Sequence, residues 1–382
     1  MKRKVIRLVT EAEVVLFHMQ NTLKRMPADF EVCVVGAGVS GYRVDFPSVT
    51  FVDINITRKP NLIADLRALV ALCKVYRSYR PDIVHSIMPK AGLLSTVAGF
   101  LTRVPVRLHT FTGQVWASRS GRSRRTYQLL DKVITVFNST CTTDSFSQSM
   151  FLFENGISKK GLPLPVLGKG SLSGVDLGRF NLHSTAAGAS VLRTQLGLDQ
   201  KFVFTFIARK TRDKGAVDML KAFSSVVATC ADARLLFVGP DEDGEIDRLA
   251  TIHPELFVNV TNVGQVANHE IFLAVTDVLC LPSYREGFGS IVIDAAAMQV
   301  PTIGSRIPGL TDSIVDGETG LLFSAGNLTE LVEHMQHLLK DPTLRHRLGI
   351  AAKARVDEAF TADFLYSALK DFYLSFSLVR RY

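Results

Sequence analysis

Short apolar runs alternate with amphipathic helical stretches along the whole chain, and this alternation limits the fold more than any other feature. In the first half, the expected strands are Val5–Val9, Val32–Val35, Val49–Ile54, Asp82–Ile87 and Val106–Thr110. In the second half, they are Phe202–Ala208, Arg234–Val238, Phe257–Val263, Asp277–Leu281 and Pro301–Gly304. Runs without polar positions, such as Val278-Leu279-Cys280-Leu281, suit parallel strands that are covered on both faces. The pattern predicts an α/β fold with two doubly wound, Rossmann-like domains.

The boundary between these domains is expected in a segment rich in Gly, Pro and Ser, Lys159–Phe180. We therefore expect a first domain over residues 1–180 and a second over residues 181–360, sizes typical of single domains. The tract His183–Ser190 consists of small and polar residues and is interpreted as a loop. The C-terminal segment 361–382 is more apolar than a lone terminal helix requires, which indicates that it packs back on the first domain.

A glycine pattern in the first half needs to be tested against a dinucleotide site. Gly36-Ala37-Gly38-Val39-Ser40-Gly41 spells G-x-G-x-x-G, but that fingerprint requires a helix that begins at the glycines. Only the eight residues Tyr42–Val49, Pro47 among them, separate Gly41 from the strand-like run Thr50–Ile54, which leaves no room for a crossover helix. We interpret the segment as a glycine-rich loop and expect no flavin or nicotinamide cofactor.

The net charge of +8 is distributed unevenly. Residues 1–180 hold 25 Lys and Arg against 12 Asp and Glu, whereas residues 181–382 hold 19 against 24. A nucleic-acid partner is one explanation, but no nucleic-acid-binding motif accompanies the charge, and an anionic membrane surface or a polyanionic substrate fits as well. The five scattered cysteines indicate reduced thiols. No signal peptide or membrane span is expected, so the predicted location is cytoplasmic.

Two clusters in the second half carry the candidate chemistry. The first is IARKTRDKG, in which Arg209 and Lys214 follow an expected parallel strand. Ligands of open α/β sheets bind beyond such strand ends, and two cations converging there would neutralise a diphosphate. The other interpretation is an ordinary solvated basic loop.

The second cluster is PSYREGFGSIVIDAAAMQVP, which follows the expected strand Asp277–Leu281 and leads into a helix near Gly289. Gly287 and Gly289 expose backbone N–H groups at the helix start, where anions bind. Glu286 and Asp294 are either ligand-binding carboxylates or, more simply, a capping acid and an ordinary helical acid.

Taken together, these blocks resemble the family 4 retaining glycosyltransferases, which have the GT-B fold of two Rossmann-like domains facing each other across a cleft. The resemblance rests on PSYREGFGSIVIDAAAMQVPTIGS, IVDGETGLLF, ARKTRDKG, LFVGPDEDGE, NVGQV, SGVDLGRF and LHTFTGQVWA. Along the chain these blocks follow one another in the order that the family has. The resemblance covers nearly the whole chain. Within the family, the sequence blocks most resemble those of bacterial enzymes that extend polyprenyl-diphosphate-linked glycans, such as precursors of O-antigen, capsule or N-glycans.

The resemblance implies a role for each matching residue. Arg209 and Lys214 would hold the donor diphosphate, and Glu286 would bind hydroxyls of the transferred sugar. Asp294 would take the nucleotide ribose, although the family usually has Glu at this position. Further donor contacts would come from Val266 beside the base, and from His109, which would touch the sugar as a catalytic residue together with Glu286. Backbone amides of the helix start would cap the phosphates: Gly287, Phe288, Gly289, Ser290 and Ile291.

The implied activity is transfer of a hexose or N-acetylhexosamine from a nucleotide diphosphate sugar, expected to be UDP-linked, to a lipid-linked saccharide with retention of configuration. No metal is expected, because Asp241-Glu242-Asp243 is spaced like a metal motif but is interpreted as a solvated turn. A sugar-nucleotide epimerase of the same fold, a transferase with a soluble acceptor, an oxidoreductase and a nucleic-acid-binding protein remain as alternatives.

Four arginines follow the LHTFTG block, namely Arg119, Arg122, Arg124 and Arg125. They form either a solvated loop and helix start or a surface for phosphates. Arginines are unfavourable at a helix N-terminus because of its dipole, which suggests that they serve another purpose. We expect them to bind an anionic membrane surface and a polyprenyl-diphosphate acceptor, placing the protein peripherally on the inner face of the cell membrane.

Overall fold

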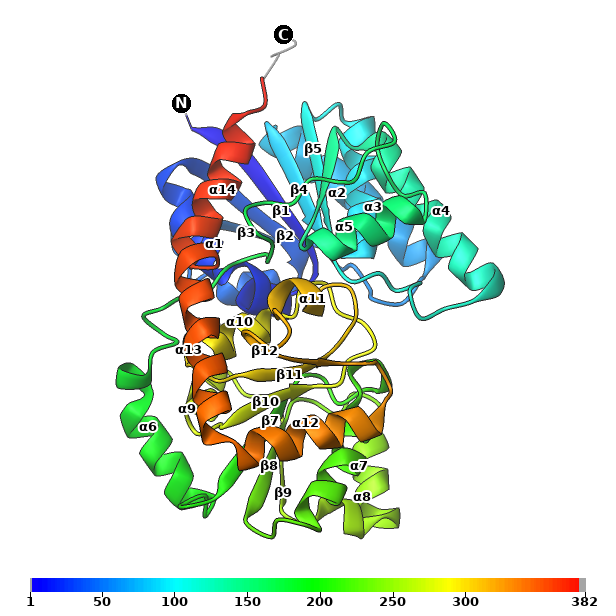
Figure 1. Cartoon of the computed structure of the whole chain (residues 1–382). Coiled ribbons are helices and arrows are strands. Elements are labelled where there is room, and N and C mark those ends of the chain that lie inside the picture. Colours follow the sequence, from blue (N-terminus) through cyan, green and yellow to red (C-terminus); the bar gives the residue numbers. More distant parts are fainter. Residues whose placement is uncertain (1, 378–382) are drawn as a thin grey trace. The chain divides into compact units, whose positions relative to one another are not determined.

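The computed structural model describes residues 2–377 and divides into two compact units. The first unit contains the chain up to Gly174 together with the residues from Ala362 on, and the second is Val175–Thr361. The division falls inside the segment that the composition marks as a linker. Each unit has its own six-stranded parallel sheet with helices packed on it (Figure 1), so the predicted α/β class is confirmed.

The sheet of the first unit has the strand order β3-β2-β1-β4-β5-β6. Its strands are β1 (Arg3–Glu11), β2 (Phe30–Ala37), β3 (Thr50–Asp53), β4 (Ile83–Ile87), β5 (Val106–Phe111) and β6 (Thr140–Thr143). Its α-helices are α1 (Gln20–Arg25), α2 (Leu62–Tyr79), α3 (Pro89–Leu101), α4 (Gly121–Phe137), α5 (Phe146–Glu154) and α14 (Ala362–Leu374). The sequence predicts the first five strands but not β6, whose residues Thr-Cys-Thr-Thr form no apolar run.

The longest apolar run of the sequence belongs to this unit. Ala91–Thr102 forms most of α3, which is buried through Ala91, Leu94 and Ala98. No helix in residues 2–377 has the length and apolar character needed to cross a membrane.

The glycine-rich loop lacks the geometry of a dinucleotide site. After β2, Gly38 has a φ of 70° and leads into a single 3-10 turn, Val39–Tyr42. A Cβ atom on Gly36 would lie 2.8 Å from the carbonyl oxygen of Val9, so this glycine is needed where β1 and β2 run close together. The expectation that no α-helix begins at these glycines is confirmed.

The C-terminal helix α14 lies against α1 in the first unit (Figure 1). Leu369 and Tyr373 belong to the same buried cluster as residues of β1 and β2. The Tyr373 hydroxyl is 2.6 Å from Nδ1 of His85, and Arg3 donates a hydrogen bond to the Tyr373 carbonyl oxygen. Leu365, Leu369 and Tyr373 of the C-terminal helix are therefore buried inside this unit, whereas Phe364 is 40% exposed.

The sheet of the second unit has the order β12-β11-β10-β7-β8-β9. Its strands are β7 (Phe202–Ile207), β8 (Ala233–Val238), β9 (Val260–Val263), β10 (Val278–Leu281), β11 (Thr302–Ser305) and β12 (Gly320–Phe323). Its α-helices are α6 (Leu182–Gln195), α7 (Ala216–Val227), α8 (Glu245–Ile252), α9 (His269–Ala274), α10 (Ser290–Ala297), α11 (Leu310–Ser313), α12 (Leu328–Lys340) and α13 (Pro342–Ala359).

Two sequence interpretations of this unit are wrong. The tract His183–Ser190 lies within α6 rather than in a loop, because Asn181 caps the helix by accepting a hydrogen bond from the His183 N–H and the alanines favour helix. Strand β9 begins at Val260 rather than Phe257, because Pro254–Phe257 forms a 3-10 turn.

Candidate active site

The candidate site lies where the order of the second sheet reverses. On one side of β7 the sheet continues with β8 and then β9. On the other side it continues with β10, β11 and β12. Strands β7 and β10 are neighbours, so their carboxyl ends flank the switch point, where open α/β sheets bind ligands. The two sequence clusters follow these two strands, which brings them together.

The loop after β7 holds two consecutive basic residues with different environments. Lys210 is buried, and its Nζ donates to Oδ1 of Asn262 at 2.5 Å and to the carbonyl oxygen of Val263 at 2.6 Å. Burial lowers the pKa of Lys210 to about 8. Arg209 is only partly buried and pairs with Glu242 at 3.0 Å. Lys210 thus anchors the loop to β9. Of these two residues, Arg209 is the one whose side chain a ligand can reach.

Gly215 brings the two loops into contact. It has a φ of 69°, and a Cβ atom at this position would lie 2.0 Å from the carbonyl oxygen of Pro282, the first residue after β10. Only glycine fits this approach and this backbone conformation. The contact sets Lys214, the preceding residue, beside the loop that carries Glu286.

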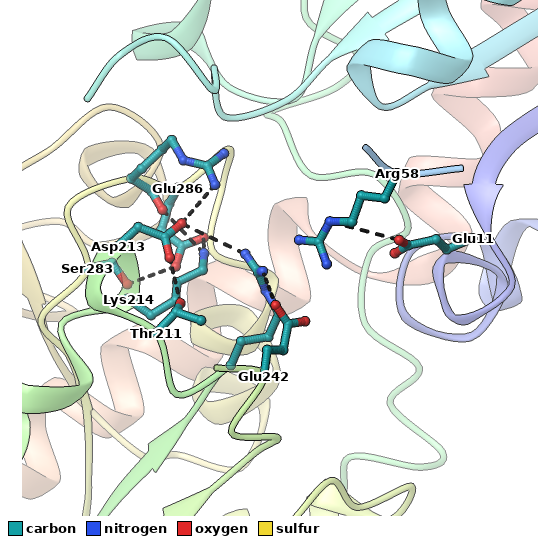
Figure 2. A network of polar contacts seen from close by, with 10 residues as sticks. Glu11, Arg58, Thr211, Asp213, Lys214, Glu242, Ser283 and Glu286 are labelled. Atoms are coloured by element: carbon teal, nitrogen blue, oxygen red, sulfur yellow. Dashed lines mark hydrogen bonds and ion pairs between the residues drawn. The ribbon is translucent and has the colours of Figure 1, made fainter. Parts of the chain in front are cut away.

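Lys214 and Glu286 form the centre of the site. Nζ of Lys214 is 2.7 Å from Oε2 of Glu286, and the side chains are 15% and 12% exposed. Ser283 donates its hydroxyl to Oε1 of Glu286 at 2.9 Å, and Lys214 also donates to the carbonyl oxygen of Arg285 at 3.2 Å. Figure 2 shows Lys214, Ser283 and Glu286 pointing toward one another. The ion pair thus joins the cation that the resemblance assigns to diphosphate binding and the carboxylate that it assigns to sugar binding.

Asp213 and Arg285, which the sequence analysis did not single out, tie the same two loops together. Nη2 of Arg285 is 2.8 Å from Oδ2 of Asp213, and Thr211 donates to Oδ1. Burial acts to raise the pKa of Asp213, but the Thr211 hydrogen bond and the charge of Arg285 hold it below its usual value. Each is the sequence neighbour of a predicted site residue, Lys214 or Glu286, and this adjacency was the signal that could have identified them.

Helix α10 begins beside Glu286. Gly289 has a φ of 76° and offers no side chain to cap the helix, so the N–H groups of Ser290 and Ile291 lie at an uncapped N-terminus. The Phe288 side chain is buried against Phe360, so only its backbone is available to an anion. The geometry is that of an anion-binding helix start. Asp294 lies farther along α10, near His269, and Val266 is half-buried in the loop after β9.

His109, which the resemblance assigns to the donor sugar, is buried in the first unit. It lies in the middle of β5, is 1% exposed, and its Nδ1 is 3.0 Å from the Ser86 hydroxyl. A Cβ atom on Gly92 would be 2.4 Å from its Cε1, so α3 closes over the ring. Burial lowers the pKa of His109 to about 3. The ring is therefore neutral and surrounded by residues of its own unit, and its contact with the donor sugar stays a prediction.

The four arginines of the first unit do not share one environment. Arg122, Arg124 and Arg125 lie in the first turn of α4, and Arg119 precedes it. Arg124 donates to Oδ1 of Asn155 at 2.8 Å and lies over the Trp116 ring, so it is part of the internal packing. The others are exposed, with Arg119 over the Tyr127 ring.

The acidic run Asp241-Glu242-Asp243 is not simply solvated. Oδ2 of Asp241 accepts from the N–H groups of Ile246 and Asp247 at the start of α8, and Glu242 pairs with Arg209. Within residues 2–377, no three His, Cys, Asp or Glu side chains are arranged to hold a metal ion.

Two family models match separate parts of this chain. Residues 190–355 match the model described as glycosyl transferases group 1, and residues 10–145 match a glycosyl transferase 4-like domain. The chain is 29% identical over 327 residues to the capsular polysaccharide biosynthesis glycosyltransferase CapM of Staphylococcus aureus, covering 85% of this chain and 84% of that one.

A second relative is UDP-Gal:alpha-D-GlcNAc-diphosphoundecaprenol alpha-1,3-galactosyltransferase of Escherichia coli. It is 25% identical over 322 residues, covering 82% of this chain and 80% of that protein. Among solved structures, the fold is similar to that of Anabaena Alr3699/HepE in complex with UDP and glucose, with a TM-score of 0.80 and 16% identity over 98% of this chain and all of that one. The two sequence models, the relatives and the fold identify this chain as a GT-B glycosyltransferase with a group 1 glycosyltransferase domain.

Proposed function

We propose that the protein transfers a hexose or N-acetylhexosamine from a UDP-linked sugar to a lipid-linked saccharide, with retention of configuration, in the assembly of a bacterial surface polysaccharide. The observation that carries the donor assignment is the Lys214–Glu286 pair beside the N-terminus of α10. CapM and the undecaprenol-linked galactosyltransferase support the acceptor assignment, and HepE, solved with UDP, supports the nucleotide.

In this proposal the protein's contribution is mainly electrostatic. Arg209, Lys214 and the N–H groups at the start of α10 stabilise the negative charge that develops on the departing diphosphate. Glu286 accepts hydrogen bonds from hydroxyls of the transferred sugar and, through Lys214, stays next to the diphosphate site. The leaving diphosphate takes the proton of the acceptor hydroxyl as the new glycosidic bond forms on the same face.

A nucleotide-sugar screen tests the donor assignment. Specific binding to the folded state raises the melting temperature by mass action, so one class of UDP-sugar is expected to stabilise the protein while nicotinamide dinucleotides and duplex DNA do not. Incubation of that donor with and without a polyprenyl-diphosphate saccharide then separates the reactions. Transfer that needs the lipid supports the proposal, whereas free sugar formed without acceptor would identify an epimerase.

Transfer is expected to continue in EDTA. The cations Arg209 and Lys214 and the helix N-terminus supply the positive charge that a metal ion would otherwise bring to the diphosphate. Initial rates in EDTA and in added magnesium should therefore be similar. Complete loss on chelation, with recovery on adding magnesium or manganese, would contradict metal independence.

We further propose peripheral attachment to the inner, anionic face of the membrane through the outer face of α4. Arg122 and Arg125 are exposed at its start, and Leu129, Lys132 and Val136 are exposed farther along the same helix. Exposed apolar side chains that are flanked by basic ones can enter a membrane interface while the basic groups stay near anionic headgroups.

Changing Arg119, Arg122 and Arg125 together to glutamine is expected to release the protein from anionic liposomes and to raise KM for the lipid acceptor. Each basic residue near such a surface adds roughly 1 kcal/mol. Arg124 is kept, because it packs on Trp116. The matched control changes three exposed cations of the second unit, Arg212, Lys221 and Arg248, to glutamine. Sedimentation of the α4 variant like the parent protein at physiological salt would contradict the assignment.

A further inference from the structure

Asp294 is paired with a histidine that neither the sequence analysis nor the proposed function uses. His269 is the first residue of α9, and its Nε2 is 3.4 Å from Oδ2 of Asp294 on α10. The two side chains are only 12% and 17% exposed. The imidazole is therefore a close polar partner of a carboxylate that is itself mostly buried.

Neighbouring residues fix the orientation of the imidazole. The Phe180 ring, which is buried, lies 5.2 Å from the His269 ring, centroid to centroid, at a tilt of 47°. Its neighbour Arg179 forms an ion pair at 2.6 Å with Glu270 and donates to the carbonyl oxygen of Ala267. The segment before α6 thus holds the first turn of α9 and the loop that contains Val266, so His269 has little freedom to turn away from Asp294.

The chemistry of the pair suits a vicinal diol. An ionised carboxylate has two acceptor oxygens, and an imidazole N–H that occupies one of them leaves the other aimed in a defined direction. Aspartate reaches one methylene less far than glutamate, so its direction matters more. We propose that His269 is a positioning residue that orients Asp294 to accept hydrogen bonds from the ribose diol of the donor. The site would then select ribonucleoside over 2′-deoxyribonucleoside diphosphates.

This inference rests on the proposed function, because it assumes that a nucleoside diphosphate binds beside α10. The test measures calorimetric Kd values of the whole protein for UDP, GDP and ADP and for their 2′-deoxy forms. For the base that binds most tightly, removal of the 2′-hydroxyl is expected to weaken binding of the parent by about 10-fold or more, since a charged acceptor loses its donor. The ratio of the Kd of the deoxy form to the Kd of the ribo form measures this selectivity. In Asp294→Ala, which lacks the acceptor, the ratio is expected to be near one.

The decisive variant is His269→Phe, which keeps a ring beside Phe180 but removes the N–H donor. Its deoxy-to-ribo ratio is expected to fall at least about threefold below the parent ratio, as a lost hydrogen bond would predict. His269→Gln, whose amide can donate, should lie closer to the parent. His253→Phe is the matched control, because His253 is an exposed histidine of the same unit that pairs with Glu255, and its ratio should be unchanged.

The outcomes separate the two proposals. If His269→Phe weakens ribo and deoxy forms equally, or leaves both unchanged, the histidine has only a packing role and this inference is wrong while the donor assignment stands. If the parent binds none of the three nucleoside diphosphates, the proposed function fails and the positioning role fails with it.

Discussion

Replacing Lys214 by alanine is expected to lower the turnover of glycosyl transfer by about 100-fold or more while the protein stays folded. Loss of one preorganised group that stabilises developing negative charge has an effect of this size. Lys214 is also the cation that neutralises Glu286 at 2.7 Å, so its removal leaves a carboxylate unpaired beside the diphosphate. The measurement is the initial rate with saturating donor, alongside the melting temperature.

Arg212→Ala provides the control for Lys214→Ala. Arg212 lies in the same 3-10 turn, but its side chain is 83% exposed and pairs with Glu245 at 2.6 Å. Its loss should leave the rate unchanged. Glu286→Ala is expected to resemble Lys214→Ala, because it removes the other half of the pair. Turnover within threefold of the parent in either site variant would refute the assignment.

Replacing Gly215 by alanine is expected to destabilise the second unit and to abolish donor binding. A non-glycine residue at a φ of 69° costs roughly 1–3 kcal/mol by itself. The added Cβ would also lie 2.0 Å from the carbonyl oxygen of Pro282, so the loops must separate. Lys214 would then move away from Glu286. Thermal unfolding and nucleotide titration measure the two effects.

Gly244→Ala separates backbone strain from the close approach. Gly244 precedes α8 as Gly215 precedes α7, and it has a φ of 64°, but no heavy atom lies within 4 Å of a Cβ placed there. This variant should lose some stability and keep full donor affinity. If the two variants have the same melting temperature and affinity, the contact between the loops does not build the site.

Most of the fold could be predicted from the sequence, and the failures have local causes. Apolar runs such as Val278–Leu281 predict the buried strands, because a parallel strand covered on both faces is apolar throughout. Strand β6, Thr140–Thr143, and strand β12, Gly320–Phe323, are four-residue strands at the two sheet edges. Each lies beside one other strand and makes only an isolated bridge besides, Thr143 with Val166 and Gly320 with Asp316, so its identity as a strand depends on the sheet beside it rather than on its own pattern.

The candidate site, like the fold, could be predicted from the sequence only in part. The positions of Arg209, Lys214 and Glu286 after parallel strands follow from the chain itself, because strand ends are read from local sequence. Spacing could not tell that Arg209 is partly exposed while Lys210 is buried against Asn262, or that Arg285 holds Asp213. These pairings join residues up to 72 positions apart, and only the packed sheet sets their distances.

The sequence by itself therefore determined the two parallel sheets and the two clusters that meet at the second sheet's switch point. It also determined that no α-helix begins at the glycines Gly36, Gly38 and Gly41. The tertiary structure alone decided which polar residues are available. It buried His109 beneath α3, packed Arg124 on Trp116 and set His269 beside Asp294. The physical reason is that strand and helix periodicity is written in neighbouring residues, whereas burial and charge pairing depend on elements that meet only when the chain is folded.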